Sequence, residues 1–263
     1  MAKELEHEVA YYYDLYPTEE DLMGETSDHS MLVRYLMEVL TWFFEDQTCA
    51  VYENLNFYQT DYYKEEPLAP DIAVIKGVAF RRVRSWRVGK TGPPPQVVFE
   101  IASKETWKKD VQEKPDKYAQ MGVQEYFTYD PHEPPLQRRP SRRLRGWRLD
   151  PLTQQMRELP LRADGRLWSI HLESFLVSDG SFLRLTDQYG KRRLTRAEAE
   201  AEARQAEARR AEIAERRAEI ESRRAEAEQR RAEEEARQAE VERRRADALA
   251  EKLRSLGIDP GQL

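Results

Sequence analysis

Cysteine and long apolar runs are scarce in this sequence of 263 residues. The single cysteine, Cys49, excludes a disulfide within the chain and suits a reducing compartment. No apolar run approaches the roughly 18 residues that a membrane span requires, and the polar first residues differ from a secretory signal peptide. We therefore expect a soluble, cytoplasmic protein with no membrane partner.

Glycine and histidine are also scarce. The 11 glycines do not cluster into a phosphate-binding loop, so a nucleotide-dependent activity is not expected. The four histidines lack the spacing of metal ligands, which argues against a zinc site. Met1–Gly190 has a net charge of −7, which argues against purely electrostatic binding of nucleic acid. Any such binding must depend on local basic patches and on bound metal.

Charged residues, by contrast, are abundant and unevenly distributed. They make up 35% of the chain, above the usual share in a globular domain. Lys191–Leu263 contains 19 basic and 18 acidic residues, which leaves 24 basic and 31 acidic residues for Met1–Gly190. The first part is long enough for one domain with a proper core. We expect a folded domain over residues 1–190 and a separate charged segment over 191–263.

The charged segment has the pattern of one long helix. Thr195 to Glu198 fits a capping box, and no proline or glycine follows until Gly257. Arg-Arg-Ala-Glu recurs with a period of seven, and glutamate repeatedly precedes arginine by four residues, which stabilises a helix. Alanine and glutamate occupy positions where a coiled coil needs larger apolar residues. A charge-stabilised single helix is favoured, and a coiled coil that forms a weak homodimer is the alternative.

The first part alternates between helical and strand patterns. Apolar residues spaced by three and four predict a helix over His29–Glu45. A second helix is predicted over Lys104–Met121, ending at Gly122, and Pro115 either kinks it or starts a new helix. Short apolar runs predict strands at residues 49–58, 72–75, 97–102, 125–129, 143–149, 155–159, 167–172 and 182–186. This order predicts a mixed α/β domain.

Two acidic residues stand on otherwise apolar strands. One is Asp71, and the other is Glu100, whose neighbours Phe99 and Ile101 should point to the opposite face of the sheet. Burying a carboxylate without a partner is costly. A divalent cation held between the two carboxylates would offset that cost. Alternatively, each carboxylate pairs with an arginine or emerges at the end of its strand.

Three segments resemble a known family. They read Ala-Pro-Asp-Ile-Ala-Val at 69–74, Val-Val-Phe-Glu-Ile-Ala-Ser-Lys-Glu-Thr at 97–106 and Met-Gly-Val-Gln-Glu-Tyr-Phe-Thr-Tyr-Asp-Pro at 121–131. Asp110, Lys114 and Tyr118 lie between the last two. Together these residues resemble the Uma-type putative restriction endonuclease family, a branch of the PD-(D/E)XK nucleases. The resemblance covers nearly the whole chain and implies a restriction-endonuclease-like mixed sheet flanked by helices, followed here by the long charged helix.

The resemblance assigns roles to the two acids. Asp71 corresponds to the motif aspartate of the family and Glu100 to its second acid. We expect both carboxylates and the backbone carbonyl of Ile101 to hold Mg²⁺, or alternatively Mn²⁺. Such an ion polarises a phosphate and lowers the pKa of a bound water, which is the chemistry of phosphodiester hydrolysis. Glu25, in the matching N-terminal motif, is a weaker candidate for the same site.

The resemblance also implies a catalytic lysine. The superfamily often has this lysine two residues after the second acid, but that place holds Ala102 here. In the Uma-type family the lysine comes from the following helix, where Lys114 matches. We expect Lys114 to orient the water or to stabilise the developing charge. Lys104 and Lys117 are the substitutes if Pro115 misdirects Lys114.

Two arginine-rich stretches, each with a tryptophan, are candidate DNA-binding patches. Arginine contacts phosphates, and an aromatic ring can stack on a base. The candidate residues are Arg81, Arg82 and Arg84 in the first stretch and Arg142, Arg143 and Arg145 in the second. The alternative is a solvated loop and an alternating strand whose tryptophans, Trp86 and Trp147, pack on the core.

Taken together, the residues and the resemblance predict a Mg²⁺-dependent endonuclease that cuts DNA, with Asp71, Glu100 and Lys114 as its catalytic residues. The alternative from another functional class is an interaction module. In that case the nuclease fold has lost its activity and the helical segment supplies the function.

Overall fold

The computed structural model describes residues 27–59, 66–136 and 142–255. The chain divides into two compact units, Met1–Ala199 and Glu200–Leu263. Within those described ranges, no helix combines the length and the apolar composition needed to cross a bilayer.

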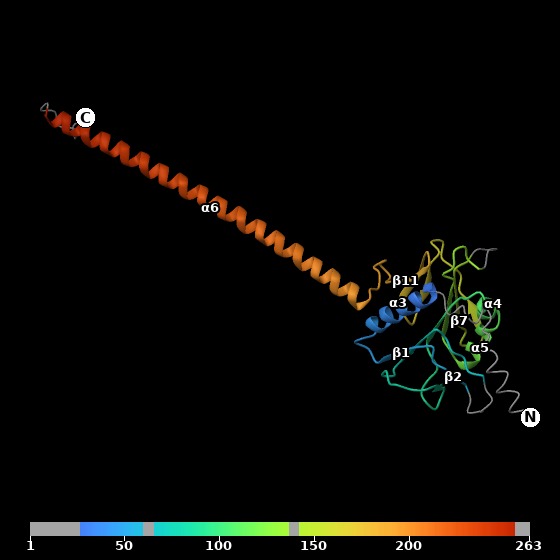
Figure 1. Ribbon diagram of the computed structural model, residues 1–263. Helices are drawn as coiled ribbons and strands as arrows, with labels where there is room; N and C mark the ends of the chain where they lie inside the picture. The colour runs from blue at the N-terminus through green and yellow to red at the C-terminus, as the bar shows by residue number, and fades with distance from the viewer. Residues whose placement is uncertain (1–26, 60–65, 137–141, 256–263) are drawn as a thin grey trace, which may run out of the picture. The chain divides into compact units, whose positions relative to one another are not determined.

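The first unit is built on a six-stranded sheet with the order β1-β3-β5-β6-β7-β8 (Figure 1). Its strands are β1 (Cys49–Glu53), β3 (Ile72–Lys76), β5 (Val97–Ile101), β6 (Glu125–Tyr129), β7 (Leu144–Leu149) and β8 (Met156–Glu158). β5 and β6 are parallel, and the other neighbours are antiparallel. The mixed α/β sheet predicted from the sequence is therefore confirmed.

Smaller elements surround this sheet. Helix α3 (Ser27–Phe43) precedes it, and helices α4 (Trp107–Gln112) and α5 (Lys114–Met121) connect the two parallel strands. The remaining strands are β2 (Phe57–Tyr58) and β4 (Trp86–Arg87), which pair in parallel, and β9 (Leu167–Ser169), β10 (Ser174–Asp179) and β11 (Phe182–Thr186), which form an antiparallel sheet. A parallel pair such as β5 and β6 requires a crossover connection, which α4 and α5 supply.

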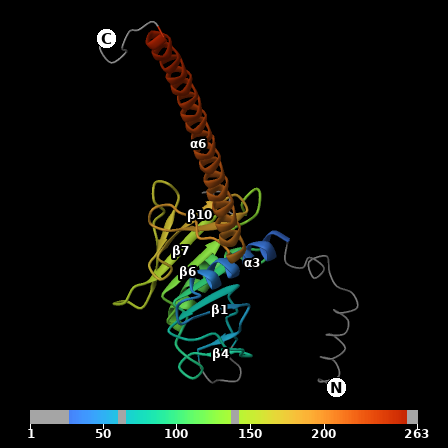
Figure 2. The ribbon, with the colours of Figure 1, turned by 90° about the vertical axis from the view of Figure 1, so that its left-hand side faces the viewer.

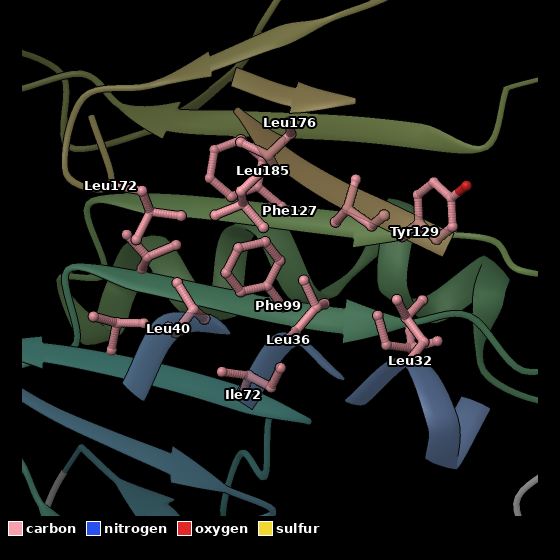
Figure 3. Close-up of a cluster of buried hydrophobic side chains, with 14 of the residues drawn as sticks. Leu32, Leu36, Leu40, Ile72, Phe99, Phe127, Tyr129, Leu172, Leu176 and Leu185 are labelled. Carbon is pink, nitrogen blue, oxygen red and sulfur yellow. The ribbon is translucent and has the colours of Figure 1, made fainter. Parts of the chain in front are cut away.

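The core has two parts because side chains alternate across β5. On one face Phe99 and Ile101 pack against α3 and the leucines of β10 and β11. Figure 3 shows Leu36 and Leu40 of α3 near Phe99, with Leu32 on the side of Tyr129, and in Figure 2 α3 lies in front of the strands. On the other face Val98 packs with Tyr118 of α5. Glu100 shares this second face, so α5 covers it, as the alternation predicts.

Pro115 starts a new helix. α4 ends at Gln112, α5 begins at Lys114, and the proline lies in the first turn of α5. Proline is well suited to a first turn because its missing N–H has no partner there. Gly122 ends α5 in the left-handed conformation, with φ 85°, as expected. The second reading of Pro115 is therefore correct, and Lys114 begins a helix instead of lying inside one.

Several predicted strands have different bounds. The segment 49–58 forms two strands, β1 and β2, because Asn54 turns the chain with φ 47°. The segment 167–172 ends as a strand at Ser169, since the next amides, Ile170 and His171, donate to the carboxylate of Glu125. β4 and β10 are not predicted: β4 has two residues, and the burial along β10 does not alternate.

Helix α6 (Arg196–Ser255) is continuous for 60 residues, a length of about 90 Å at about 1.5 Å per residue. The capping box is formed: the Thr195 amide donates to Glu198 Oε2 at 2.8 Å, and the Glu198 amide donates to Thr195 Oγ1 at 3.2 Å. Three of the predicted pairs are ion pairs, Glu212–Arg216, Glu219–Arg223 and Glu240–Arg244. The helix is thus stabilised locally, as its composition predicts.

Candidate active site

Asp71 and Glu100 lie next to each other at one end of the sheet. β3 and β5 are antiparallel with Ile72 opposite Phe99, so Asp71, which directly precedes β3, lies beside Glu100. The Ile101 amide donates to Asp71 Oδ2 at 2.6 Å, which fixes the aspartate against β5. Asp71 is 8% exposed and Glu100 is 5% exposed. Two carboxylates from neighbouring strands are therefore buried together.

Lys114 joins this pair. Its Nζ lies 2.8 Å from Glu100 Oε1 and 2.8 Å from Asp110 Oδ1. The other two lysines considered point elsewhere: Lys104 is exposed, and Lys117 pairs with Glu113 at 4.0 Å on the surface. The start of α5 at Lys114 therefore aims the residue that the resemblance selects at the buried acids.

Further contacts complete the cluster, and the sequence does not reveal them. Asp110 is 1% exposed, and its Oδ2 accepts a hydrogen bond from Thr106 Oγ1 at 2.9 Å. Tyr118 Oη donates to Glu100 Oε1 at 2.5 Å. His29 Nε2 lies 3.3 Å from Asp71 Oδ1. We call Asp71, Glu100, Asp110 and Lys114 the acid–lysine cluster.

The electrostatics of the cluster are unusual. Burial raises the pKa of Glu100 from 4.5 to about 7; Lys114 opposes this shift, and Asp71 and Asp110 add to it. Burial lowers the pKa of Lys114, but Glu100 and Asp110 outweigh burial, so the pKa of the ammonium is raised. Lys114 thus serves two buried carboxyl groups beside a third, Asp71, so additional positive charge would stabilise the site.

Glu125 shows that a buried acid on a strand need not form a site. It is fully buried on β6, yet Arg148 Nη2 donates to it at 2.8 Å and Ser169 Oγ at 2.5 Å. The amides of Ile170 and His171 also donate to it. Because its oxygens are satisfied by fixed donors, Glu125 has a structural role, unlike the acid–lysine cluster.

The second arginine stretch lies at the same end of the sheet. β7 starts with Leu144 opposite Tyr129, at the end of β6, which runs parallel to β5. A pocket there is lined by Ala102, Trp107, Asp110, Val111, Thr128, Tyr129, Asp130, Leu136, Arg142, Arg143 and Arg145. Asp110 belongs both to this pocket and to the acid–lysine cluster, so the two are adjacent.

The arginines of this pocket are held by protein groups. Arg145 donates two hydrogen bonds to Glu158 at 2.9 Å, and Arg142 donates one to the same carboxylate at 3.3 Å. Arg143 donates to the carbonyl oxygen of Asp130 at 3.1 Å. Trp147 is buried in the core with Tyr118 of α5, which is the alternative to base stacking that the sequence left open.

The first arginine stretch lies in the loop that follows β3. Asp71 precedes the start of this strand, so the stretch and Asp71 lie at opposite ends of β3. Arg81, Arg82 and Arg84 are exposed, and Arg81 Nη2 donates to the Thr91 carbonyl at 2.6 Å. Trp86 is fully buried. Among the described residues, no hydrogen bond or ion pair joins these arginines to the acid–lysine cluster.

The donor set of the cluster fits a hard cation. In the described part of the chain, no group of three or more His, Cys, Asp or Glu side chains is arranged to hold a metal ion. Two carboxylates and the carbonyl of Ile101 nevertheless match Mg²⁺, which is usually bound through one or two carboxylates and retains several waters. Glu25 lies outside the described residues.

The mixed sheet, its flanking helices and the acid–lysine cluster define a restriction-endonuclease-like α/β protein. Comparison with known families agrees: the chain belongs to the Uma2 family, described as a putative restriction endonuclease, which matches residues 8–174. Membership supports a nuclease role.

A similar solved structure is a crystal structure of a putative nuclease belonging to DUF820 from Anabaena variabilis. It has a TM-score of 0.39 and 15% identity over 56% of this chain and 74% of that one. No curated protein matches the sequence.

Proposed function

We propose that this protein is a Mg²⁺-dependent endonuclease that hydrolyses DNA, and that Mn²⁺ can replace Mg²⁺. The observation that carries the proposal is the contact of the Lys114 ammonium with Glu100, beside Asp71. A lysine next to two buried acids, in a chain of a restriction endonuclease family, is the arrangement that phosphodiester hydrolysis needs.

Each residue of the cluster has a distinct task in this proposal. Asp71 and Glu100, with the Ile101 carbonyl, would hold the ion, which would supply a Lewis acid and an activated water. The Ile101 amide holds Asp71 in place, and Tyr118 holds Glu100. Lys114 contributes a positive charge where negative charge develops on the phosphate.

The pocket beside the cluster is the proposed contact with DNA. Its arginines supply charge for phosphates, and Trp107 supplies a surface on which a base can stack. Arg142 and Arg145 share Glu158, so binding requires them to exchange this carboxylate for phosphate oxygens. Arg81, Arg82 and Arg84, in the loop that follows the end of β3 remote from Asp71, remain a proposed second contact.

Plasmid cleavage with Mg²⁺ or Mn²⁺ tests the proposal. Wild-type protein should cut, Asp71→Ala and Glu100→Gln should not, and EDTA should stop the reaction. Asp116 is an exposed carboxylate on α5, and the Asp116→Asn variant is the matched control, which should cut normally. A wild-type protein that neither binds metal nor cuts DNA would favour the inactive interaction module instead.

A further inference from the structure

The Lys114 ammonium is shared equally between two buried acids. Nζ lies 2.8 Å from Glu100 Oε1 and 2.8 Å from Asp110 Oδ1. Only Glu100 is a proposed metal ligand. Since a divalent ion and an ammonium repel each other, both cannot lie close to the same carboxylate at low cost. An ion bound to Glu100 would therefore favour movement of the Lys114 ammonium away from this carboxylate.

The two acids differ in their other partners. Glu100 Oε1 also accepts a hydrogen bond from Tyr118, so it keeps a donor if Lys114 leaves. Asp110 Oδ1 is buried and, in the described ranges, has no hydrogen-bond donor other than the nearby ammonium. Loss of Lys114 would leave that oxygen unpaired, which is costly. The contacts thus favour retention of Lys114 by Asp110.

Asp110 is also fixed in place. Thr106 Oγ1 donates to its Oδ2, and Tyr126 Oη donates to its backbone carbonyl at 2.8 Å. Because the Lys114 ammonium already contacts both acids, a small displacement is enough to shift it from Glu100 towards Asp110.

We propose that Lys114 is a resident cation on Glu100 in the metal-free site, and that Asp110 takes over its ammonium when the divalent ion binds. This inference rests on the proposed function. Asp110 is then a positioning residue: it controls metal affinity without touching the metal, and it keeps Lys114 beside the scissile phosphate. Metal affinity therefore depends on competition between an internal ammonium and the external ion.

Calorimetric titration with Mn²⁺, without DNA, tests the exchange. Lys114→Met should bind Mn²⁺ on the order of tenfold more tightly than wild type, because the competing cation is gone. Asp110→Asn should bind it on the order of tenfold more weakly, because Lys114 then stays on Glu100. Lys117→Met and Asp116→Asn are the matched exposed controls and should leave the affinity unchanged.

The double variant separates this exchange from a simple effect of charge. In the Lys114→Met background, Asp110→Asn should have little further effect on Mn²⁺ affinity. A loss of the same size in both backgrounds would overturn the proposal, because Asp110 would then act on the ion through its own charge. Should Asp110→Asn fail to fold, Thr106→Val, which releases Asp110 Oδ2, should weaken binding in the wild-type background alone.

Two other outcomes are distinguishable. Wild-type protein that binds no Mn²⁺ would refute the metal site, and with it the proposed function. Wild-type protein that binds Mn²⁺ while Lys114→Met binds it no more tightly would refute only the exchange of the lysine.

Discussion

The buried Glu100 carboxyl should make the metal-free protein less stable as the pH rises. Its pKa is raised from 4.5 to about 7, so the folded state holds this proton more tightly than the unfolded state. Stability from this group is therefore fully present below pH 4.5 and is lost as the pH rises through about 7. At about 1.4 kcal/mol per pKa unit, the loss is about 3–4 kcal/mol.

Glu100→Gln removes this dependence, because a glutamine stays neutral and can still accept the Tyr118 hydrogen bond. Urea unfolding in EDTA at pH 5 and pH 8 measures the difference. The variant should gain stability over wild type by roughly 2–3 kcal/mol more at pH 8 than at pH 5.

The exposed Glu113→Gln, in the same connection between strands, is the control and should show no such gain. A difference between Glu100→Gln and wild type that is the same at both pH values would refute the assignment of a raised pKa to this carboxyl.

Three further predictions concern the lysine, the arginine pocket and the long helix. Lys114→Met should reduce the rate of plasmid cleavage by about 10²–10³, the effect of removing one fixed charge stabiliser, whereas Lys117→Met should not. Arg145→Ala should weaken DNA binding and reduce its salt dependence by about one counterion, measured by fluorescence anisotropy at several salt concentrations; an unchanged slope would exclude a phosphate contact. Removing Glu200–Leu263 should leave the melting temperature and the rate of cleavage nearly unchanged. Aggregation of the shortened protein would show that the first unit needs the helix to stay folded.

The bounds of that truncation follow from contacts that the sequence does not reveal. Charge composition places the start of the charged segment at Lys191. Cζ of Arg193, however, lies 4.2 Å from the ring centre of Phe43, and Nη2 of Arg193 donates to the Glu173 carbonyl. Thr195 is buried at 6% exposure. These residues belong to the first unit, which extends to Ala199, so a cut that spares them tests the helix alone.

Local patterns were sufficient for much of the fold. The alternation of side chains along β5 places Glu100 and Phe99 on opposite faces of the sheet, and the capping residues Thr195 and Glu198 mark the start of α6. Pro115 was ambiguous, because a proline is compatible with a kink or a new first turn until its neighbours are placed.

The composition of the cluster could be predicted only in part. Asp110 stands four residues before Lys114, a spacing that could have suggested a pair on a helix. His29 gave no signal, because only the fold brings it to Asp71. Glu125 has the same sequence signal as Glu100, and only its donors, such as Arg148, distinguish a structural acid from a candidate ligand.

Anomalous scattering from crystals soaked in Mn²⁺ tests the central claim most directly. We expect one peak within coordination distance of the carboxylates of Asp71 and Glu100 and of the Ile101 carbonyl, with the Lys114 ammonium turned towards Asp110. A peak elsewhere, or none at these residues in protein that still cuts DNA, would contradict the assignment of this cluster as the metal centre.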